Sequence, residues 1–240
     1  MTKTGPWERE DIGSTGEHKG DPKLRSMQPG VLIGADGWRL RAEVPEAGFT
    51  LTMEADEVTA EAENAELIGR CVPLTARGQV REAMLAQLRA ARQVLAGSGI
   101  RYLCVLAADV DGRPRMLVLA VAAATWEPPK SIDAASLLTA MLRHTYPHAS
   151  ALVEEFQTDH GPAVGVRRCD ELTLPFPGPD GKPTKIDTGI SQAIVIFPRT
   201  RLLGIVTGFC FHPTDIDLTT VFTATVAHKM TAVPYGGTLA

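Results

Sequence analysis

The chain has 240 residues and a formal net charge of −4, and 44% of its residues are hydrophobic and 22% charged. This composition is typical of globular domains, and it excludes a wholly disordered chain, a collagen-like chain and a disulfide miniprotein. The mild acidity gives no basic surface for nucleic acid, so we expect no nucleic-acid partner.

The first 30 residues are rich in glycine, proline, serine, threonine and charge, without apolar periodicity. Such a segment buries too little apolar surface to offset the entropy lost on ordering. We therefore expect 1–30 to be a disordered or loosely attached arm that is dispensable for folding, in which Trp7 is the exception, a side chain able to dock on the domain. We expect a single domain over 31–233 and a short tail over 234–240.

The first strands are predicted at 37–44 and 48–53, where apolar and polar residues alternate around a turn at Pro45. This pattern indicates a first hairpin. Residues 54–66 hold six acids and no base, which predicts a solvated loop, and 65–72 is expected to form a short strand.

Two helices and a central hairpin follow. An apolar stripe at helical spacing predicts a helix over 77–96. The apolar runs 100–108 and 115–125 flank Asp111-Gly112 and predict a hairpin that is covered on both faces. Ser131 is expected to cap a second helix that ends near residue 143.

Apolar runs predict two more strand pairs, separated by a loop rich in proline and glycine at 174–185: 151–157 with 163–168, and 192–197 with 201–211. Thr214 and Asp217 have the spacing of a capping box and predict the start of a C-terminal helix. Because hairpins dominate and no βαβ unit is present, we predict an α+β fold, an antiparallel sheet with helices packed on it.

The strand pattern of the second half resembles actinobacterial members of the Mog1/PsbP-like superfamily. The resemblance is carried by four stretches: 162–168, 190–198, 201–210 and 214–230. The openings Gly37-Trp38 and Gly48-Phe49 are also similar to the start of that family. The use of 17 arginines against 7 lysines is similar to that of a high-GC actinobacterium. The resemblance implies an α/β/α sandwich and a non-enzymatic binding or assembly role, and it supplies no catalytic residues.

The strongest catalytic candidates are His212, Asp215 and Asp217, which cluster where a strand meets a helix N-terminus. A carboxylate–histidine set can perform acid–base chemistry. Acids at a helix N-terminus are equally explained by capping and by the helix dipole.

Two other patterns are weaker. Ser191 lies in a degenerate G-x-S-x-G pattern, but a strand rather than a helix follows it, so we interpret it as a serine at the start of a strand. His144 and His148 have metal-ligand spacing, with His160 as a third ligand, but Pro147 interrupts the shared helical face. We therefore expect no metal and no cofactor.

Charge is unevenly placed, because 43–66 hold eight acids and no base whereas 70–101 hold six arginines and one acid. Arg81, Arg89 and Arg92 lie off the apolar stripe of their predicted helix. One interpretation is a solvated helix face partly paired with the acidic segment. The other is an electrostatic docking surface for a protein.

The chain has four cysteines that are far apart in sequence: Cys71, Cys104, Cys169 and Cys210. Three of the four lie in apolar runs. We expect buried free thiols in a reducing compartment. No apolar leader and no run long enough to cross a bilayer is present, so we expect a cytoplasmic protein that does not insert into a membrane.

Our leading hypothesis is a non-catalytic, cytoplasmic accessory factor that binds a protein partner or associates with itself. The alternative is a small-molecule-binding or hydrolytic enzyme that uses the His212, Asp215 and Asp217 region.

Overall fold

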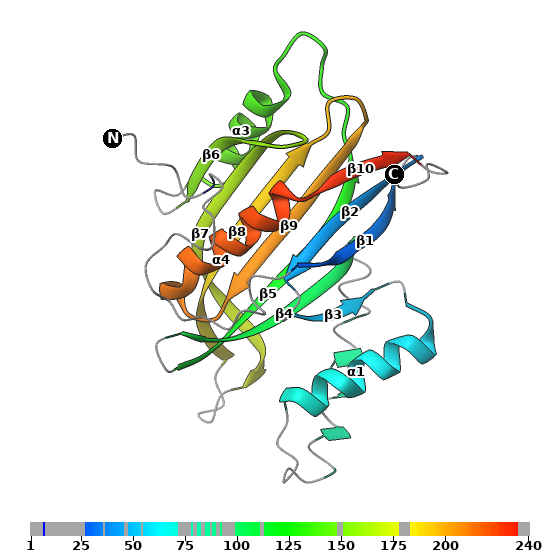
Figure 1. Ribbon diagram of the computed structural model, residues 1–240. Helices are drawn as coiled ribbons and strands as arrows, with labels where there is room; N and C mark the ends of the chain where they lie inside the picture. The colour runs from blue at the N-terminus through cyan, green and yellow to red at the C-terminus, as the bar shows by residue number, and fades with distance from the viewer. Residues whose placement is uncertain are drawn as a thin grey trace.

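The computed structural model describes Trp7 and the ranges 27–35, 37–45, 48–53, 55–71, 99–110, 113–147, 151–177 and 183–234, together with separate helical residues between 78 and 92. In these parts of the chain every strand pairing is antiparallel. Helices and a second, smaller sheet pack against the long sheet (Figure 1). The predicted α+β class is confirmed.

The larger sheet has seven strands in the order β3-β4-β5-β9-β8-β7-β6. Their bounds are β3 Phe49–Thr52, β4 Ile100–Val110, β5 Arg113–Thr125, β6 Leu152–Thr158, β7 Gly161–Pro177, β8 Pro183–Ile196 and β9 Leu202–Cys210. The predicted hairpins β4–β5, β6–β7 and β8–β9 are all present. β5 lies between β4 and β9, so it is a central strand of the sheet.

The smaller sheet has the order β1-β2-β10 and covers one face of the larger sheet together with a helix (Figure 1). Its strands are β1 Met27–Ala35, β2 Trp38–Pro45 and β10 Thr231–Pro234, and the helix is α4 Ile216–His228, preceded by the 3-10 turn η2 Pro213–Asp215. Leu40 and Val44 of β2 are buried in the same core as Phe222 of α4. This face therefore holds the main core.

Glycines in the sheet let α4 approach it closely. A Cβ atom at Gly208 of β9 would lie 2.4 Å from the hydroxyl oxygen of Thr223 and 2.7 Å from Cγ2 of Thr219. Four threonines of α4 donate their hydroxyls to the carbonyl four residues earlier: Thr219, Thr220, Thr223 and Thr225. The helix thus satisfies these polar groups itself, three of which are buried against the sheet.

The opposite face of the sheet is covered by α3 Ala134–Thr145, which packs Leu138 and Leu142 on β6, β7 and β8. The helix is capped by Asp133, whose carboxylate accepts the Ser136 N–H at 2.8 Å. The predicted cap at Ser131 is therefore wrong, because the chain turns once more before the helix begins.

The acidic segment is a helix, α1 Glu57–Cys71, so the predicted loop at 54–66 and strand at 65–72 are wrong. It lies at the β3 end of the sheet (Figure 1). Its Leu67 packs with Leu88 against the buried Leu51 of β3. The described residues between 78 and 92 are helical, in agreement with the helix predicted over 77–96.

Three further expectations about local structure are wrong. β2 pairs with β1 and β10 whereas β3 pairs with β4, so 37–44 and 48–53 belong to two sheets and form no hairpin. Most of the loop expected at 174–185 continues β7 and β8, which stay paired at Pro177 and Pro183. Thr214 lies in η2, and the N-cap position of α4 makes no side-chain capping bond.

Trp7 is 1% exposed and belongs to the main core. β1 begins at Met27, inside the segment expected to be an arm. The other residues of 1–26 and residues 235–240 lie outside the described parts, so the arm, the tail and the domain boundaries stay predictions. Among the described helices, none has the length and apolar character needed to cross a membrane.

Candidate functional site

The candidate residues at the junction of β9 and α4 have different environments. Asp215 is buried, at 6% exposure, whereas His212 and Asp217 are exposed. Asp217 forms an ion pair with Arg167 of β7, a residue that the sequence did not single out. The charge of Asp217 is therefore already compensated within the chain, and a catalytic role for the three residues stays a prediction.

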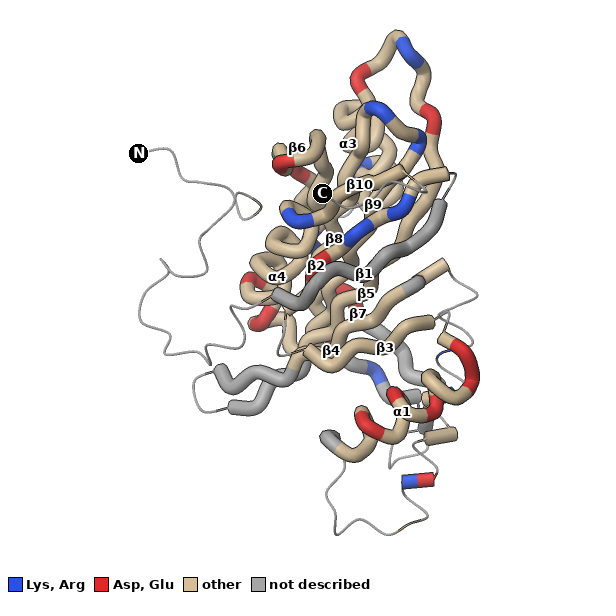
Figure 2. The backbone as a smooth tube through the Cα atoms, turned by 45° about the vertical axis from the view of Figure 1, so that its right-hand side comes forward, with Lys and Arg blue, Asp and Glu red and all other residues tan. Residues whose placement is uncertain are grey.

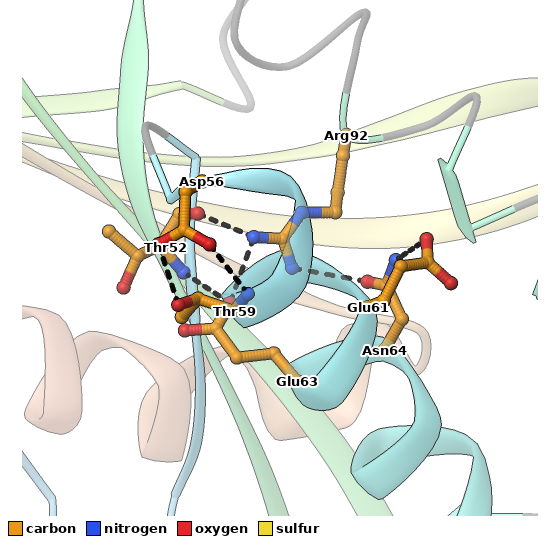
Figure 3. Close-up of polar contacts among 7 residues, drawn as sticks. All are labelled: Thr52, Asp56, Thr59, Glu61, Glu63, Asn64 and Arg92. Carbon is orange, nitrogen blue, oxygen red and sulfur yellow. Dashed lines mark hydrogen bonds and ion pairs between the residues drawn. The ribbon is translucent and has the colours of Figure 1, made fainter.

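Two of the three candidate arginines, Arg89 and Arg92, bind the acidic helix. Arg92 is 7% exposed, and Figure 3 shows its guanidinium group pointing to α1 and β3. Its Nη2 donates to a carboxylate oxygen of Glu63 at 2.8 Å and to the Thr52 carbonyl oxygen. Its Nη1 donates to the side-chain oxygen of Asn64 at 3.1 Å.

Glu63 completes this arrangement, because the same oxygen that binds Arg92 also accepts the Thr52 N–H at 3.0 Å (Figure 3). Both backbone groups of Thr52 are therefore occupied by side chains. Thr52 ends β3, an end strand of the larger sheet, and unpaired groups on such a strand can pair with another chain. The cluster thus binds the backbone groups of the last residue of this edge strand and attaches α1 to it.

Arg89 forms a second pair with α1, in which its Nε donates to Glu61 at 2.7 Å. The pair lowers the pKa of the Glu61 carboxyl, chiefly through this hydrogen bond. Arg81 is half-buried on the same helical segment. The interpretation of a helix face partly paired with the acidic segment thus has direct contacts, and docking through Arg81, Arg89 and Arg92 stays a prediction.

Ser191 lies inside β8, opposite Arg167 on β7 and Gly208 on β9, and it is fully buried. The strand begins at Pro183, so the interpretation of Ser191 as a serine at the start of a strand is wrong. A nucleophile elbow needs a serine exposed on a turn before a helix, and this position has neither feature.

The histidine pattern does not form a metal centre in the part of the chain that the structure describes. His144 is exposed in the last turn of α3, and His160 is exposed in the turn between β6 and β7. His148 lies outside the described residues.

Cys104 and Cys210 are buried free thiols, as predicted, whereas Cys169 is exposed. Burial raises the pKa of Cys104 to about 12. Burial also raises the pKa of Cys210, whose Sγ lies 3.6 Å from the Gly189 carbonyl oxygen. Raised pKa values keep these thiols protonated, which is the opposite of a reactive cysteine. The side chain of Cys71 lies outside the described residues.

The β6 end of the sheet differs from the β3 end, because β6 is the last strand and no described strand lies on its outer side. Thr158 pairs with Gly161 across a two-residue turn. In such a hairpin the flanking pair exchanges both hydrogen bonds, so Val153, Glu155 and Gln157 direct their backbone groups outward. Arg143 of α3 donates to the Val153 carbonyl oxygen at 3.2 Å, which agrees with this register.

Among the described residues, three of the five exposed large apolar side chains lie in elements near this edge. Ile132, Met141 and Leu152 are 48%, 50% and 42% exposed. They lie in the turn before α3, on α3 and at the start of β6. We call Val153, Glu155 and Gln157, together with these three apolar residues, the β6 edge. Sequence patterns do not identify the β6 edge, because which strand lies at an edge depends on the order of strands in the sheet.

Comparison with known proteins finds no matching family model, no matching curated protein and no matching solved structure. The function of this chain is therefore inferred from its own geometry.

Proposed function

We propose that this protein is a non-catalytic accessory factor that binds another protein, and that it does so through the β6 edge. The observation that carries the proposal is the difference between the two ends of the larger sheet. At β3 the backbone groups of Thr52 are bound by Glu63 and Arg92. At β6 the Val153 carbonyl accepts from Arg143, and the outward backbone groups of Glu155 and Gln157 have no described strand beside them.

An open edge strand binds extended segments by adding a strand to the sheet. The backbone then supplies hydrogen bonds, and neighbouring side chains supply selectivity. Exposed Leu152 and Met141 offer apolar contacts next to the edge. A strand edge flanked by apolar side chains is thus suited to hold a segment of another chain.

The charge of β6 favours a basic partner segment. Glu155 is exposed and Glu154 half-buried, and acidic residues are visible on β6 in Figure 2. A second copy is a poorer occupant, because antiparallel pairing of two β6 strands centred on Glu155 places like charges opposite each other. We infer an extended segment that carries lysine or arginine.

The resemblance to Mog1/PsbP-like proteins supports the same role as a proposal, since that fold class is used mostly by binding and assembly factors. The α+β class of the chain agrees with it at the coarse level. A cytoplasmic location is part of this proposal.

The test is site-specific photo-crosslinking in the organism of origin. A photoreactive amino acid replaces Gln157, an exposed residue with outward backbone groups. In the control it replaces Val58, which is 81% exposed on α1, far from β6 along the sheet. We expect position 157 to crosslink to one protein through a basic segment and position 58 not to do so.

The matched variants are Leu152→Glu, at the edge, and Val58→Glu, away from it. The first is expected to reduce the crosslink at least tenfold, and the second to leave it unchanged, with both proteins folded by circular dichroism. Equal crosslinking from both positions, or insensitivity to Leu152→Glu, would overturn the proposal. Loss of function in Asp215→Asn with an intact crosslink would favour the enzyme instead.

A further inference from the structure

The open part of β6 ends at an arginine. α3 lies beside β6 (Figure 1), and Arg143 in the last turn of α3 donates from Nη2 to the Val153 carbonyl oxygen at 3.2 Å. Val153 is 6% exposed, whereas Glu155 and Gln157 are exposed. A strand added to β6 can therefore pair at Glu155 and Gln157, and it meets Arg143 when it reaches Val153.

The guanidinium group of Arg143 has donors to spare. Such a group carries five N–H bonds, and the contact with Val153 uses one of them. Arg143 is exposed, and no acid in the described parts of the chain forms an ion pair with it.

The arginines at the same level of β7 are different, because their charges are compensated. Arg167 pairs with Asp217. Arg168 donates from Nε to Asp170 at 2.6 Å. Arg143 is thus the cation that remains for a group of the partner at this end of β6.

The direction of β6 decides which end of a partner segment meets this cation. β6 runs from Leu152 to Thr158, so Arg143 lies at its N-terminal end. A segment antiparallel to β6 passes Gln157, then Glu155, and arrives at Arg143 with its C-terminal side. A parallel segment arrives with its N-terminal side. A terminal carboxylate is attracted by the guanidinium group and a terminal ammonium is repelled, so Arg143 favours the antiparallel direction.

The contact with Val153 also favours a chain that ends there. In antiparallel pairing the partner residue opposite Val153 would donate its N–H to the Val153 carbonyl. Arg143 already donates to that oxygen. What Arg143 offers at this position is donors, and a carboxylate supplies two acceptor oxygens for them in the planar geometry that a guanidinium group prefers.

We propose that Arg143 binds the C-terminal carboxylate of the partner segment, so that the β6 edge recognises the end of a protein chain. This inference rests on the proposed function and specifies which part of the partner binds. The basic residue of the segment faces Glu155 and therefore lies about one or two residues before the last one. An acidic side chain within an internal segment is the competing occupant of Arg143.

The probe is a pair of synthetic peptides with the sequence Val-Thr-Val-Thr-Lys-Thr-Val and a fluorophore at the N-terminus. One ends in a free carboxylate and the other in a carboxamide, so they differ only at the group that Arg143 is proposed to bind. The lysine is placed to face Glu155. Fluorescence anisotropy measures the binding of each peptide to the full-length protein.

We expect the free acid to bind the wild type at least tenfold more tightly than the amide. Arg143→Gln should bind both peptides equally, at the level of the amide. Arg89→Gln is the matched control, because Arg89 is an exposed arginine at the β3 end of the sheet, and it should keep the full preference. Equal binding of the two peptides to the wild type, a preference that survives Arg143→Gln, or no binding of the free acid would overturn the proposal.

A second variant covers an Arg143→Gln protein that fails to fold. Arg143→Lys keeps the positive charge but lacks the planar pair of donors. It is expected to bind the free acid severalfold more weakly than the wild type and to bind the amide as the wild type does. An unchanged affinity for the free acid would contradict recognition by the guanidinium group.

The last arm separates this inference from the proposed function. In the Gln157 crosslinking experiment, mass spectrometry of the product is expected to place the crosslink within about the last six residues of the partner. A flexible glycine–serine tail added to the C-terminus of the partner should reduce capture at least tenfold, and the same tail at its N-terminus should not.

A crosslink to an internal segment, with capture that survives the C-terminal tail, overturns recognition of the chain end and leaves binding at the β6 edge intact. Absence of a crosslink from position 157 overturns the proposed function itself.

Discussion

Arg92 and Arg89 form two ion pairs with α1 that differ in solvent exposure. The Arg92 side chain is 8% exposed in the ion pair with Glu63, whose side chain is 19% exposed. The Arg89–Glu61 pair lies nearby, with side-chain exposures of 52% and 41%. Two similar pairs between the same helices therefore differ chiefly in how far water screens them.

We predict that Arg92→Ala lowers the free energy of unfolding by about 3 kcal/mol, because it leaves Glu63 and the Thr52 carbonyl partly buried without their partner. Arg89→Ala is the matched control and should have a much smaller effect, because water replaces its exposed contacts. Urea unfolding of both variants measures the difference. Equal effects would show that the Arg92 cluster does not hold α1 on the sheet.

Cys104 is a second residue whose environment has a measurable consequence. Burial raises its pKa to about 12, so the native thiol stays protonated where the unfolded thiol already ionises. The native state then binds more protons than the unfolded state above about pH 9. Below the unfolded pKa both states carry the proton, and the thiol adds no pH dependence there.

The free energy of unfolding is therefore expected to fall as the pH rises above about 9, by up to about 1.4 kcal/mol per pH unit from this thiol. Cys104→Ala should show a shallower decline, and Cys169→Ser, at an exposed position, should follow the wild type. Urea titrations between pH 8 and 10.5 test this. A decline in Cys104→Ala as steep as in the wild type would assign the pH dependence to other groups.

At the scale of elements, close packing of α4 depends on the absence of side chains beneath it. Gly208 lies under Thr219 and Thr223, whereas a Cβ at Gly69 of α1 would meet nothing within 4 Å. The same Gly→Ala change therefore has opposite consequences in the two elements.

Gly208→Ala is expected to destabilise the protein by about 1–3 kcal/mol, because α4 must shift away from the sheet. Gly69→Ala should stabilise it by about 0.5–1 kcal/mol, because alanine is the better helix former at an exposed position. Thermal unfolding of the two variants provides the comparison. Stabilisation by Gly208→Ala would mean that α4 is packed less closely than the structure shows.

The elements that the sequence predicted well are those whose contacts are local. The hairpins β4–β5 and β6–β7 join neighbouring runs across turns that contain glycine, so periodicity and turn residues are sufficient to find them. The acidic helix α1 was predicted as a loop because its balancing charges are distant. Arg89 and Arg92 lie 28 and 29 residues from Glu61 and Glu63.

In the candidate site too, contacts that are local in sequence were predicted and contacts between distant segments were not. The His212, Asp215 and Asp217 cluster was found because the three residues are close in sequence, whereas the ion pair from Arg167 to Asp217 joins distant segments. Gly165 inside a strand was the available signal for the close approach of the Trp7 ring. Trp7 and His228 are 221 residues apart, a pairing that no local pattern indicates.

At the scale of the whole molecule, the two ends of the larger sheet have different roles in this interpretation. At the β3 end, α1 is attached through Arg89 and Arg92, and side chains bind the backbone groups of Thr52. The β6 end presents outward backbone groups beside exposed Met141 and Leu152. Trp7, from the N-terminal part of the chain, stacks on Phe156 of β6 in the main core.

Residue-resolved amide hydrogen exchange, measured by NMR on the free protein and on its complex with the crosslinked partner, tests the open edge most directly. In the free protein the amides of Val153, Glu155 and Gln157 should exchange faster than those of Glu154 and Phe156, which pair with β7. The partner should slow the exchange of the first three at least tenfold. Slow exchange of these amides in the free protein, or protection by the partner only at 212–217, would contradict binding at the β6 edge.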